Sequence, residues 1–222
     1  MPKQYGMLID LRRCIGCTSC QVACKMENGV PIGGFRSRVE IQQDGDFPVA
    51  KRYFLPKFCN HCDDPPCIQA CPVKGATYKR EDSIVTVNRD LCIGCGRCVP
   101  ACPYGSRYLQ EYLPIKNNPK PYVKDVPELA KIPVKSLRVV DKCDFCSLRL
   151  EAGQEETACT RNCFGKAIVF GDLADPNSRI SKLVASEKPD VRHPEFGTKP
   201  RVYYIAPDKK VFDAADGSLN PS

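Results

Sequence analysis

Short apolar runs recur along the chain, and each is followed at once by closely spaced cysteines. The four stretches with this order are MLIDLRRCIGCTSCQVAC (7–24), RYFLPKFCNHC (52–62), VTVNRDLCIGCGRCVPAC (85–102) and LRVVDKCDFC (137–146). Apolar runs this short, bounded by polar or turn-forming residues, predict strands rather than helices. The pattern therefore predicts a unit of strand, cysteine loop and short helix that is repeated four times.

Three further segments do not follow this repeat. Residues 178–187 (SRISKLVASE) predict a short helix, and residues 200–206 (PRVYYIA) predict a strand. Residues 109–135 contain five prolines, which favour an extended, non-helical chain. Both a surface loop and an arm that lies on a partner fit that segment. The end of the chain predicts a frayed tail.

The sequence offers little for crossing or entering a membrane. No stretch approaches the roughly 18 apolar residues of a membrane-spanning helix. Arg12 and Arg13 are followed by cysteines and not by an apolar segment, so residues 1–24 do not predict an export signal. We therefore expect no direct membrane span.

The apolar content is low for a chain that must fold around an aliphatic core. Hydrophobic residues make up 42% of the 222 residues, but this share includes 16 cysteines, and tryptophan is absent. Without cysteine the apolar share is about 35%. Something other than aliphatic packing must hold the fold together, and the cysteines are the obvious candidates.

All sixteen cysteines fall into four groups of four, and none is left over. The first and third groups have the spacing C-x2-C-x2-C-x3-C, the second has C-x2-C-x4-C-x3-C, and the fourth has C-x2-C-x12-C-x3-C. The groups are Cys14, Cys17, Cys20 and Cys24; Cys59, Cys62, Cys67 and Cys71; Cys92, Cys95, Cys98 and Cys102; and Cys143, Cys146, Cys159 and Cys163.

Disulfides, zinc and iron–sulfur clusters all use cysteine, and the spacing separates them. Neighbours at C-x2-C make strained disulfides, and disulfide scaffolds are usually shorter than this chain. Zinc typically takes two close pairs separated by a long loop. Three cysteines in seven residues, followed by a fourth after three more, match the bacterial ferredoxin run, in which the fourth thiolate reaches a second cluster. Proline follows Cys71 and Cys102, as in that run. The spacing favours [4Fe–4S] clusters, and zinc is the remaining alternative.

The net positive charge suggests a nucleic-acid partner, but the distribution of that charge along the chain opposes one. The formal charge is +7, but the Lys and Arg residues are scattered and no recognition motif is present, so we expect no nucleic acid to bind. An oxidised cluster with four thiolates carries about −2. Four clusters would therefore largely offset the basic excess.

No catalytic machinery is predicted. The sequence contains no Ser/His/Asp set, P-loop or dinucleotide fingerprint. His61 lies inside the second cysteine group, where a hydrogen-bonding role is favoured over a ligand role. Asp63 and Asp64 precede two prolines, which favours turn formation over acid/base chemistry. The remaining candidates are predicted to be packing residues, Tyr104 and Tyr108, or a surface residue, His193.

Four motifs accompany the cysteine groups. They are KMENGVP (25–31), CNHCDDPPCIQACP (59–72), FGDLADP (170–176) and GTKPRVYYIA (197–206). With these motifs, roughly residues 4–206 resemble the four-cluster electron-transfer subunit of molybdopterin oxidoreductases, which include polysulfide, thiosulfate, dimethyl sulfoxide and respiratory arsenate reductases. The likeness is to the polysulfide or thiosulfate reductase type, and the arsenate type is similar.

This resemblance implies an α+β fold of two bacterial-ferredoxin-like, two-cluster modules with extended loops and a C-terminal arm. Module A would comprise residues 1–50 and 136–170, with the first and fourth cysteine groups. Module B would comprise residues 51–108, with the second and third groups. Residues 109–135 would form a proline-rich insertion, and residues 171–222 a C-terminal arm and tail.

The resemblance also implies that the groups exchange cysteines to hold four [4Fe–4S] clusters. The four ligand sets would be Cys14, Cys17, Cys20 and Cys163; Cys24, Cys143, Cys146 and Cys159; Cys59, Cys62, Cys67 and Cys102; and Cys71, Cys92, Cys95 and Cys98. Some relatives lack one cysteine of the third group and hold a three-iron cluster, but here that group is complete. Phe164 follows Cys163 where many relatives have proline, which puts only local turn stiffness in doubt.

The function that the resemblance implies is electron transfer without catalysis. Electrons would run from quinol, through an integral membrane quinol-reactive subunit and this chain, to a molybdenum or tungsten bis-pterin catalytic subunit. In the family, module A abuts the catalytic subunit and module B faces the membrane subunit. The chain would be held at the cytoplasmic membrane through its partners, on the periplasmic face by co-export or on the cytoplasmic face. The alternative is a polyferredoxin carrier for a hydrogenase or formate-linked complex, which the FGDL and GTKPRVYYIA segments disfavour.

Overall fold

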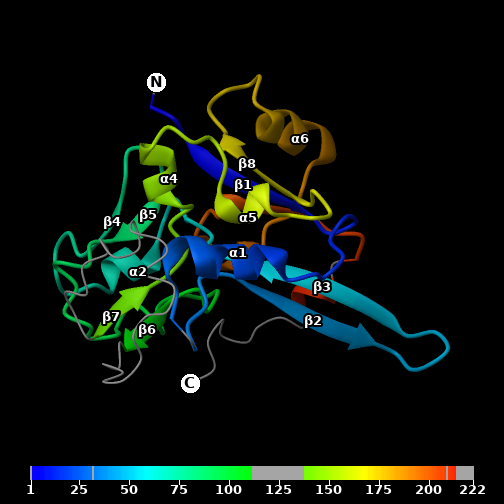
Figure 1. Cartoon of the computed structure of the whole chain (residues 1–222), viewed down its shortest axis with the longest axis horizontal. Helices are drawn as coiled ribbons and strands as arrows, with labels where there is room; N and C mark the ends of the chain where they lie inside the picture. Colours follow the sequence, from blue (N-terminus) through cyan, green and yellow to red (C-terminus); the bar gives the residue numbers. More distant parts are fainter. Residues whose placement is uncertain (1, 32, 112–137, 209, 214–222) are drawn as a thin grey trace.

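The chain folds as short strands and short helices joined by long loops (Figure 1). The computed structural model describes residues 2–31, 33–111, 138–208 and 210–213. Most of the predicted proline-rich insertion and of the predicted tail lies outside these residues. Within the described ranges, no helix is long and apolar enough to cross a membrane.

A three-stranded sheet organises the first part of the fold. β1 (Tyr5–Asp10) pairs with β8 (Ile168–Asp172) in antiparallel fashion and with β9 (Val202–Ile205) in parallel fashion. Successive side chains of a strand point to opposite faces, and residues 7–9 in the middle of β1 are all fully buried. Both faces of this sheet are therefore covered. The strand predicted over 200–206 is confirmed as β9.

α6 (Arg179–Glu187) covers one face of the sheet (Figure 1). The Ser178 hydroxyl caps the helix by accepting a hydrogen bond from the backbone N–H of Ser181 at 3.1 Å. Ile180 is fully buried. It packs in one hydrophobic cluster with Leu8, Val169 and Ile205. The helix predicted over 178–187 is thus confirmed, with its cap.

The other face of the sheet meets the cysteine loops. Met7 and Ile9 belong to a buried cluster that also contains Phe58, Phe145 and cysteines of the first, second and fourth groups. α1 (Ser19–Asn28) and α5 (Ala158–Arg161) pack against each other there. The short helix α4 (Ser147–Glu151) lies between β7 and α5 in the sequence.

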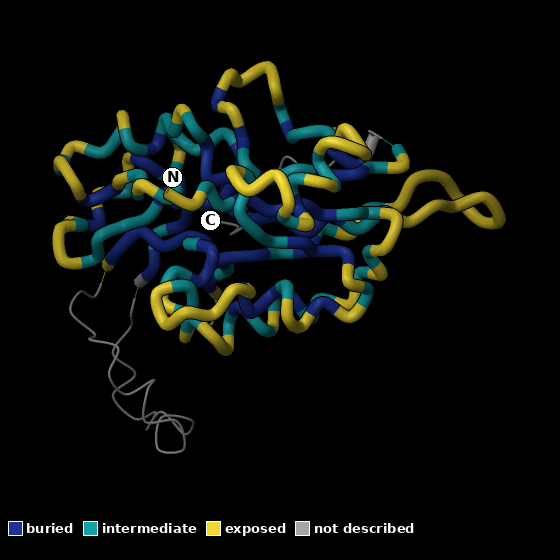
Figure 2. The backbone as a smooth tube through the Cα atoms, turned by 90° about the horizontal axis from the view of Figure 1, so that it is seen from above, coloured by how far each residue is buried: buried dark blue, intermediate teal, exposed yellow. Residues whose placement is uncertain are grey.

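Three two-stranded antiparallel sheets accompany the three-stranded sheet in the described ranges. They pair β2 (Arg38–Asp44) with β3 (Lys51–Lys57), β4 (Thr77–Lys79) with β5 (Val85–Val87), and β6 (Tyr108–Glu111) with β7 (Arg138–Asp141). The β2–β3 hairpin projects from the molecule (Figure 1), and its tip is exposed (Figure 2). The remaining short helices are α2 (Pro66–Gln69), the 3-10 helix η1 (Pro194–Phe196) and α7 (Lys210–Asp213).

The predicted unit of strand, cysteine loop and helix is confirmed in the first, second and fourth repeats, but it is wrong for the third. Residues 88–107 are all described, and they form turns without a helix. Pro100 stands two residues after the third cysteine of its group, where the first unit has Val22 within α1. Proline lacks the N–H that a helix needs at this point and clashes with the preceding turn.

Truncation of Ile180 tests the packing of α6. We expect Ile180→Ala to lower the free energy of unfolding by about 2–5 kcal/mol, the usual cost of such a truncation in a core. Ile41→Ala is the matched control, because Ile41 is 59% exposed on β2 and the same change there should cost less than about 0.5 kcal/mol. The measurement is anaerobic denaturant unfolding followed by circular dichroism. Equal midpoints for the two variants would contradict the packing described here.

Candidate metal centre

One cavity forms where the loop after β1 meets the loop before β8. The antiparallel register pairs Ile9 with Ile168, so the end of β1 lies beside the start of β8. The two loops approach so closely that a Cβ at Gly165 would meet the carbonyl oxygen of Arg13 at 2.3 Å. The cysteines that line this cavity are Cys14, Cys17, Cys20 and Cys163.

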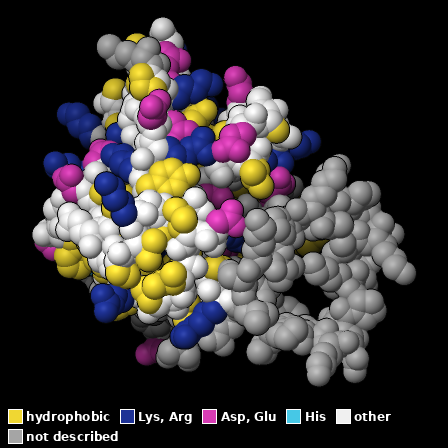
Figure 3. Space-filling view, turned by 90° about the vertical axis from the view of Figure 1, so that its left-hand side faces the viewer, with side chains coloured by type: hydrophobic (Ala, Val, Ile, Leu, Met, Phe, Trp, Pro, Cys, Tyr) yellow, Lys and Arg dark blue, Asp and Glu magenta, His cyan; other side chains and the backbone are white. Residues whose placement is uncertain are grey.

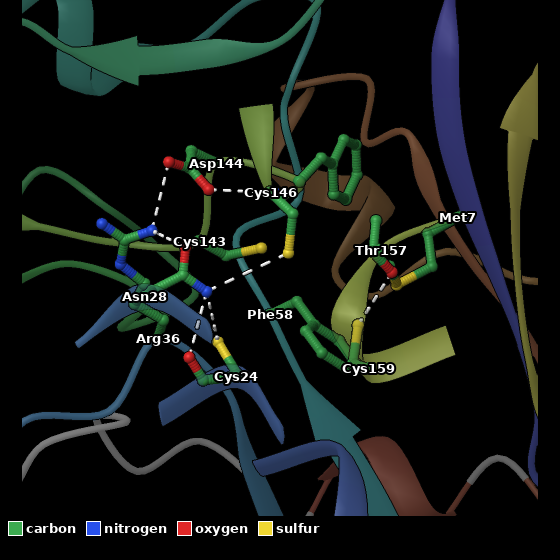
Figure 4. Close-up of a pocket in the computed structure, with 11 residues that line it drawn as sticks. Met7, Cys24, Asn28, Arg36, Phe58, Cys143, Asp144, Cys146, Thr157 and Cys159 are labelled. Atoms are coloured by element: carbon green, nitrogen blue, oxygen red, sulfur yellow. Dashed lines mark hydrogen bonds and ion pairs between the residues drawn. The ribbon is translucent and has the colours of Figure 1, made fainter. Parts of the chain in front are cut away.

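A second cavity takes the remaining cysteines of the same two groups (Figure 4). α1 carries Cys20 for the first cavity and Cys24, about one helical turn further on, for the second. Cys163, in the first cavity, lies two residues after the end of α5. The packing of α1 against α5 therefore brings the two groups together reciprocally. The cysteines that line the second cavity are Cys24, Cys143, Cys146 and Cys159.

The second and third cysteine groups exchange members in the same way. Cys71, of the second group, lies close enough to Cys98 to interact with it electrostatically, as does Cys92. Cys95 is exposed in the same loop. Cys102, of the third group, interacts electrostatically with Cys59, Cys62 and Cys67. The structure thus brings cysteines of the second group close to cysteines of the third, while Cys95 lies at the surface.

These donor sets suit a cofactor with a positive core. Burial, and next the repulsion from neighbouring cysteines, raises the pKa of the Cys20 and Cys24 thiols to about 12. Thiolate is nevertheless the form that ligates iron, so four such groups can ionise together only around a cation. All sixteen cysteines are free of disulfides. Among the described residues, no three His, Cys, Asp or Glu side chains are arranged to hold a single metal ion.

Asn28, at the end of α1, points its amide at two sulfur atoms (Figure 4). Its Nδ2 lies 3.6 Å from Cys24 Sγ and 4.0 Å from Cys146 Sγ. Its Oδ1 accepts a hydrogen bond from Arg36 Nη1 at 2.8 Å, which fixes the orientation of the amide. N–H groups directed at sulfur are among the features by which a protein sets a cluster's potential.

Arg36 is buried and neutralised by two carboxylates. Its Nε lies 2.9 Å from Asp141 Oδ2, and its Nη1 lies 3.1 Å from Asp144 Oδ2. Asp141 also accepts hydrogen bonds from the Tyr108 hydroxyl at 2.8 Å and from Arg89 Nη2 at 3.1 Å. This network ties the loop after α1 to β7, and so holds the second cavity together.

His61 is a hydrogen-bonding loop residue, as predicted. It is fully buried, and its Nδ1 accepts a hydrogen bond from the backbone N–H of Val85 at 3.1 Å. Its ring stacks on that of Phe145 with 3.7 Å between centroids. Burial, followed by the nearby positive charge of Lys142, lowers the pKa of His61 well below its ordinary value. The imidazole is therefore neutral.

Asp63 and Asp64 form a bend that fastens the C-terminal segment to the second cysteine loop. Their backbone N–H groups donate to the carbonyl oxygens of Lys199 and Thr198. The Asp63 carboxylate also accepts from Arg201 Nε at 2.7 Å. The prediction of a bend over acid/base chemistry agrees with these contacts, since the carboxylate is held by a structural ion pair.

The predictions for the aromatic and histidine candidates have mixed outcomes. Tyr104 and Tyr108 are buried packing residues, as predicted. The expected surface position of His193 is wrong, because its side chain is only 14% exposed and its ring stacks on Phe196 with 5.0 Å between centroids. That contact closes the turn around η1, and the polar sequence near Pro194 gives no sign of it.

The sequence patterns did not indicate Asn28 or Arg36. Asn28 lies in the KMENGVP motif, so that motif was the available signal. Arg36 has no comparable local signal, because its main partner, Asp141, is 105 residues away in the sequence.

Two family descriptions match the chain. The family described as a 4Fe-4S binding domain matches residues 5–26, and the family described as a 4Fe-4S dicluster domain matches residues 50–117. The molecule is therefore a ferredoxin-like iron–sulfur protein, and the predicted cofactor, the [4Fe–4S] cluster, is confirmed. Sixteen free cysteines, in four sequence groups of four, meet the needs of the four clusters predicted.

Relatives extend this match over nearly the whole chain. The chain is 40% identical to a tetrathionate reductase subunit of Salmonella typhimurium, across 99% of this chain and 79% of the relative. It is 39% identical to a polysulfide reductase chain of Wolinella succinogenes, across 95% and 97%. It is 38% identical to the arsenate respiratory reductase iron-sulfur subunit of a Shewanella species, across 91% and 96%. This chain therefore belongs to the family of iron–sulfur subunits of molybdoenzyme reductases, which carry electrons within reductase complexes.

Replacement of Asn28 tests the role of its amide. We expect Asn28→Leu to lower the equilibrium constant for reduction of one cluster several-fold, because two N–H contacts to sulfur are lost. A tenfold change in that constant is 59 mV for one electron. The matched control is Asn162→Leu, since within the described residues the Asn162 amide donates only to the Ala158 carbonyl oxygen. Potentiometric titration monitored by EPR makes the comparison. Identical potentials in the wild type and Asn28→Leu would contradict the role.

Proposed function

We propose that this chain relays electrons through four [4Fe–4S] clusters, between a membrane quinol-reactive subunit and a molybdenum or tungsten bis-pterin catalytic subunit. The complex would be a respiratory reductase of the polysulfide, thiosulfate or arsenate type. The observation that carries the proposal is the reciprocal approach of cysteines from different groups, in a member of the reductase iron–sulfur subunit family.

The ligand sets that we propose follow this grouping. One cluster would be held by Cys14, Cys17, Cys20 and Cys163, and a second by Cys24, Cys143, Cys146 and Cys159. A third would be held by Cys59, Cys62, Cys67 and Cys102, and a fourth by Cys71, Cys92, Cys95 and Cys98. The two lined cavities support the first two sets, and the electrostatic contacts among cysteines support the other two.

We further propose that the sets form two modules. Residues 1–50 and 136–170 would make module A, and residues 51–108 would make module B, with an insertion over 109–135 and a C-terminal arm and tail over 171–222. The β1–β8 pairing and the α1–α5 contact support module A. The proposed arm would not hang free, since β9 pairs with β1.

Once bound, the clusters supply the one-electron chemistry, and the chain's own residues shape their surroundings. Asn28 Nδ2 and the backbone N–H of Ala167 are directed at cysteine sulfur atoms, the latter at 3.2 Å from Cys163 Sγ. The stack of His61 on Phe145 joins the second and fourth cysteine loops. A neutral His61 adds no charge at this junction, and its burial keeps water out.

Two surfaces fit the proposed partners. Cys17 is exposed, and Ile15 and Phe164 beside it are 54% and 77% exposed. Cys95 is also exposed, in a loop where Ile93 is 68% exposed. Hydrophobic side chains gather on the end of the molecule that carries β4–β7 (Figure 3). Exposed apolar patches commonly mark protein interfaces, and we assign the surface at Cys17 to the catalytic subunit and that at Cys95 to the membrane subunit.

The protein would thus sit at the membrane through its partners, on the periplasmic face by co-export.

The reductase substrate would be set by the catalytic partner. Relatives named for tetrathionate, polysulfide and arsenate reduction are 38–40% identical to this chain. Such even similarity is expected if the chain touches no substrate and serves only to pass electrons.

Two cysteine variants test the exchange of ligands between groups. Cys71→Ser would remove a residue that we assign to the cluster held by the third cysteine group. Cys71 itself lies in the loop of the second group, which holds the neighbouring cluster. We therefore expect both clusters of module B to be lost or altered. Cys95→Ser, at an exposed cysteine assigned within its own group, should affect one cluster. EPR and iron content of the purified complex distinguish these outcomes. Cys71→Ser with all other clusters intact would contradict cross-ligation.

Metal analysis of the native complex, captured anaerobically through this chain, tests the function as a whole. We expect roughly 16 iron atoms per chain, four for each of four clusters, beyond any that belong to partners, together with molybdenum or tungsten. Iron accompanied by nickel, or by no second metal, would overturn the proposal in favour of a hydrogenase-linked or free carrier.

A further inference from the structure

Arg107 is a buried cation with no carboxylate partner among the described residues. It lies between the third cysteine group and β6, and only 1% of its surface is exposed. Its Nη1 donates a hydrogen bond to Thr77 Oγ1 at 3.3 Å. Its Nε and Nη2 are buried and reach no nitrogen or oxygen acceptor in the described part of the chain. Burial of a charge in this state is strongly unfavourable unless an anion completes the site.

The groups that face Arg107 identify that anion. The acidic groups that interact electrostatically with the guanidinium are cysteines, and Cys98 is one of them. Cys98 belongs to one proposed ligand set of module B, and the other two cysteines that interact with Arg107 belong to the other set: Cys59 and Cys67. The guanidinium therefore lies between the two sets. Lys142, which donates to the carbonyl oxygens of Val85 and Cys143, also lies near Cys67.

Arg36 shows that burial alone does not produce this situation. It is also buried beside a cysteine set, and its charge acts on Cys24. Its guanidinium, however, is paired with Asp141 and Asp144 at 2.9 and 3.1 Å. The charge of Arg36 is thus neutralised by protein, whereas that of Arg107 is left for the cysteine sets.

We propose that Arg107 is the shared counter-ion of the two module B clusters, and that it raises the reduction potentials of both. The proposal rests on the ligand sets proposed above. Each cluster becomes more negative by one charge on reduction, and a fixed positive charge in a buried, weakly screened site favours the more negative form.

The test compares a buried with an exposed arginine. Arg107→Met removes the buried charge, and Arg52→Met removes an exposed charge from β3. The potentials of all four clusters are measured in the purified complex by EPR-monitored titration. We expect Arg107→Met to lower two of the four potentials by 59 mV or more. This corresponds to at least a tenfold change in the equilibrium constant for one-electron reduction. Arg52→Met should change the reduction equilibrium of no cluster by more than about twofold, since solvent and salt screen that charge.

The outcomes separate this inference from the proposed function. A wild-type complex without four clusters would overturn the ligand sets, and the inference with them. If the wild type holds four clusters, three results for Arg107→Met would overturn the inference alone. They are four unchanged potentials, a shift in only one potential, and an equal shift in all four.

Two further variants cover a failure of Arg107→Met to assemble. Arg107→Gln lacks the charge and should show the same fall in two potentials. Arg107→Lys keeps the charge, and the reduction equilibrium of each cluster should stay within about threefold of the wild-type value. Loss of clusters in both neutral variants, with retention in Arg107→Lys, would support a requirement for the charge. A fall in Arg107→Lys as large as in the neutral variants, or equal loss of clusters in all three, would contradict it.

Discussion

Repulsion among thiolates that share a buried site is the constraint on which this fold depends. Burial and neighbouring cysteines oppose ionisation of Cys20 and Cys24, so each set of four is stable as ligands only around a cationic core. The strands need only deliver loops to such cores, which explains why the described sheets have two or three short strands. It also explains the low apolar share, since metal-centred cross-links supply stability that a larger aliphatic core would otherwise give.

Features encoded by neighbouring residues could be predicted from the sequence. Cysteine spacing predicted that these residues are cluster ligands, and local composition predicted α6 and β9, whereas the sharing of cysteines between groups was implied only by the family resemblance. The helix expected after the third cysteine group was wrong for a reason visible in the sequence. The repeat was inferred from the cysteines, which match Cys92–Cys102 to the first group, while Pro100 breaks the helix at the position of Val22. Matching ligand spacing does not guarantee matching backbone.

Features that depend on contacts between distant segments could not be predicted. The ion pair of Arg36 with Asp141 spans 105 residues, and neither residue differs locally from an exposed charge. The same holds for Arg107, whose neighbours come from the second and third cysteine loops, and for His193, whose stacking on Phe196 depends on a turn around Pro194. The sequence marks the ligands because their spacing is constrained, whereas the residues around them are constrained only by the folded structure.

Two of the buried guanidinium groups, those of Arg36 and Arg107, show how one ligand scheme can serve different electron-transfer tasks. Arg36 is balanced by Asp141 and Asp144 and so contributes mainly connectivity, whereas Arg107 has no carboxylate partner among the described residues and directs its charge toward cysteines. Relatives with different reductase names are similarly close to this chain, so overall similarity of the iron–sulfur subunit does not separate them by reductase name. A change in a buried cation or an amide near sulfur alters cluster energetics while leaving every ligand in place. Adaptation of such a chain to partners of different potential is therefore expected in these surrounding residues rather than in the cysteines.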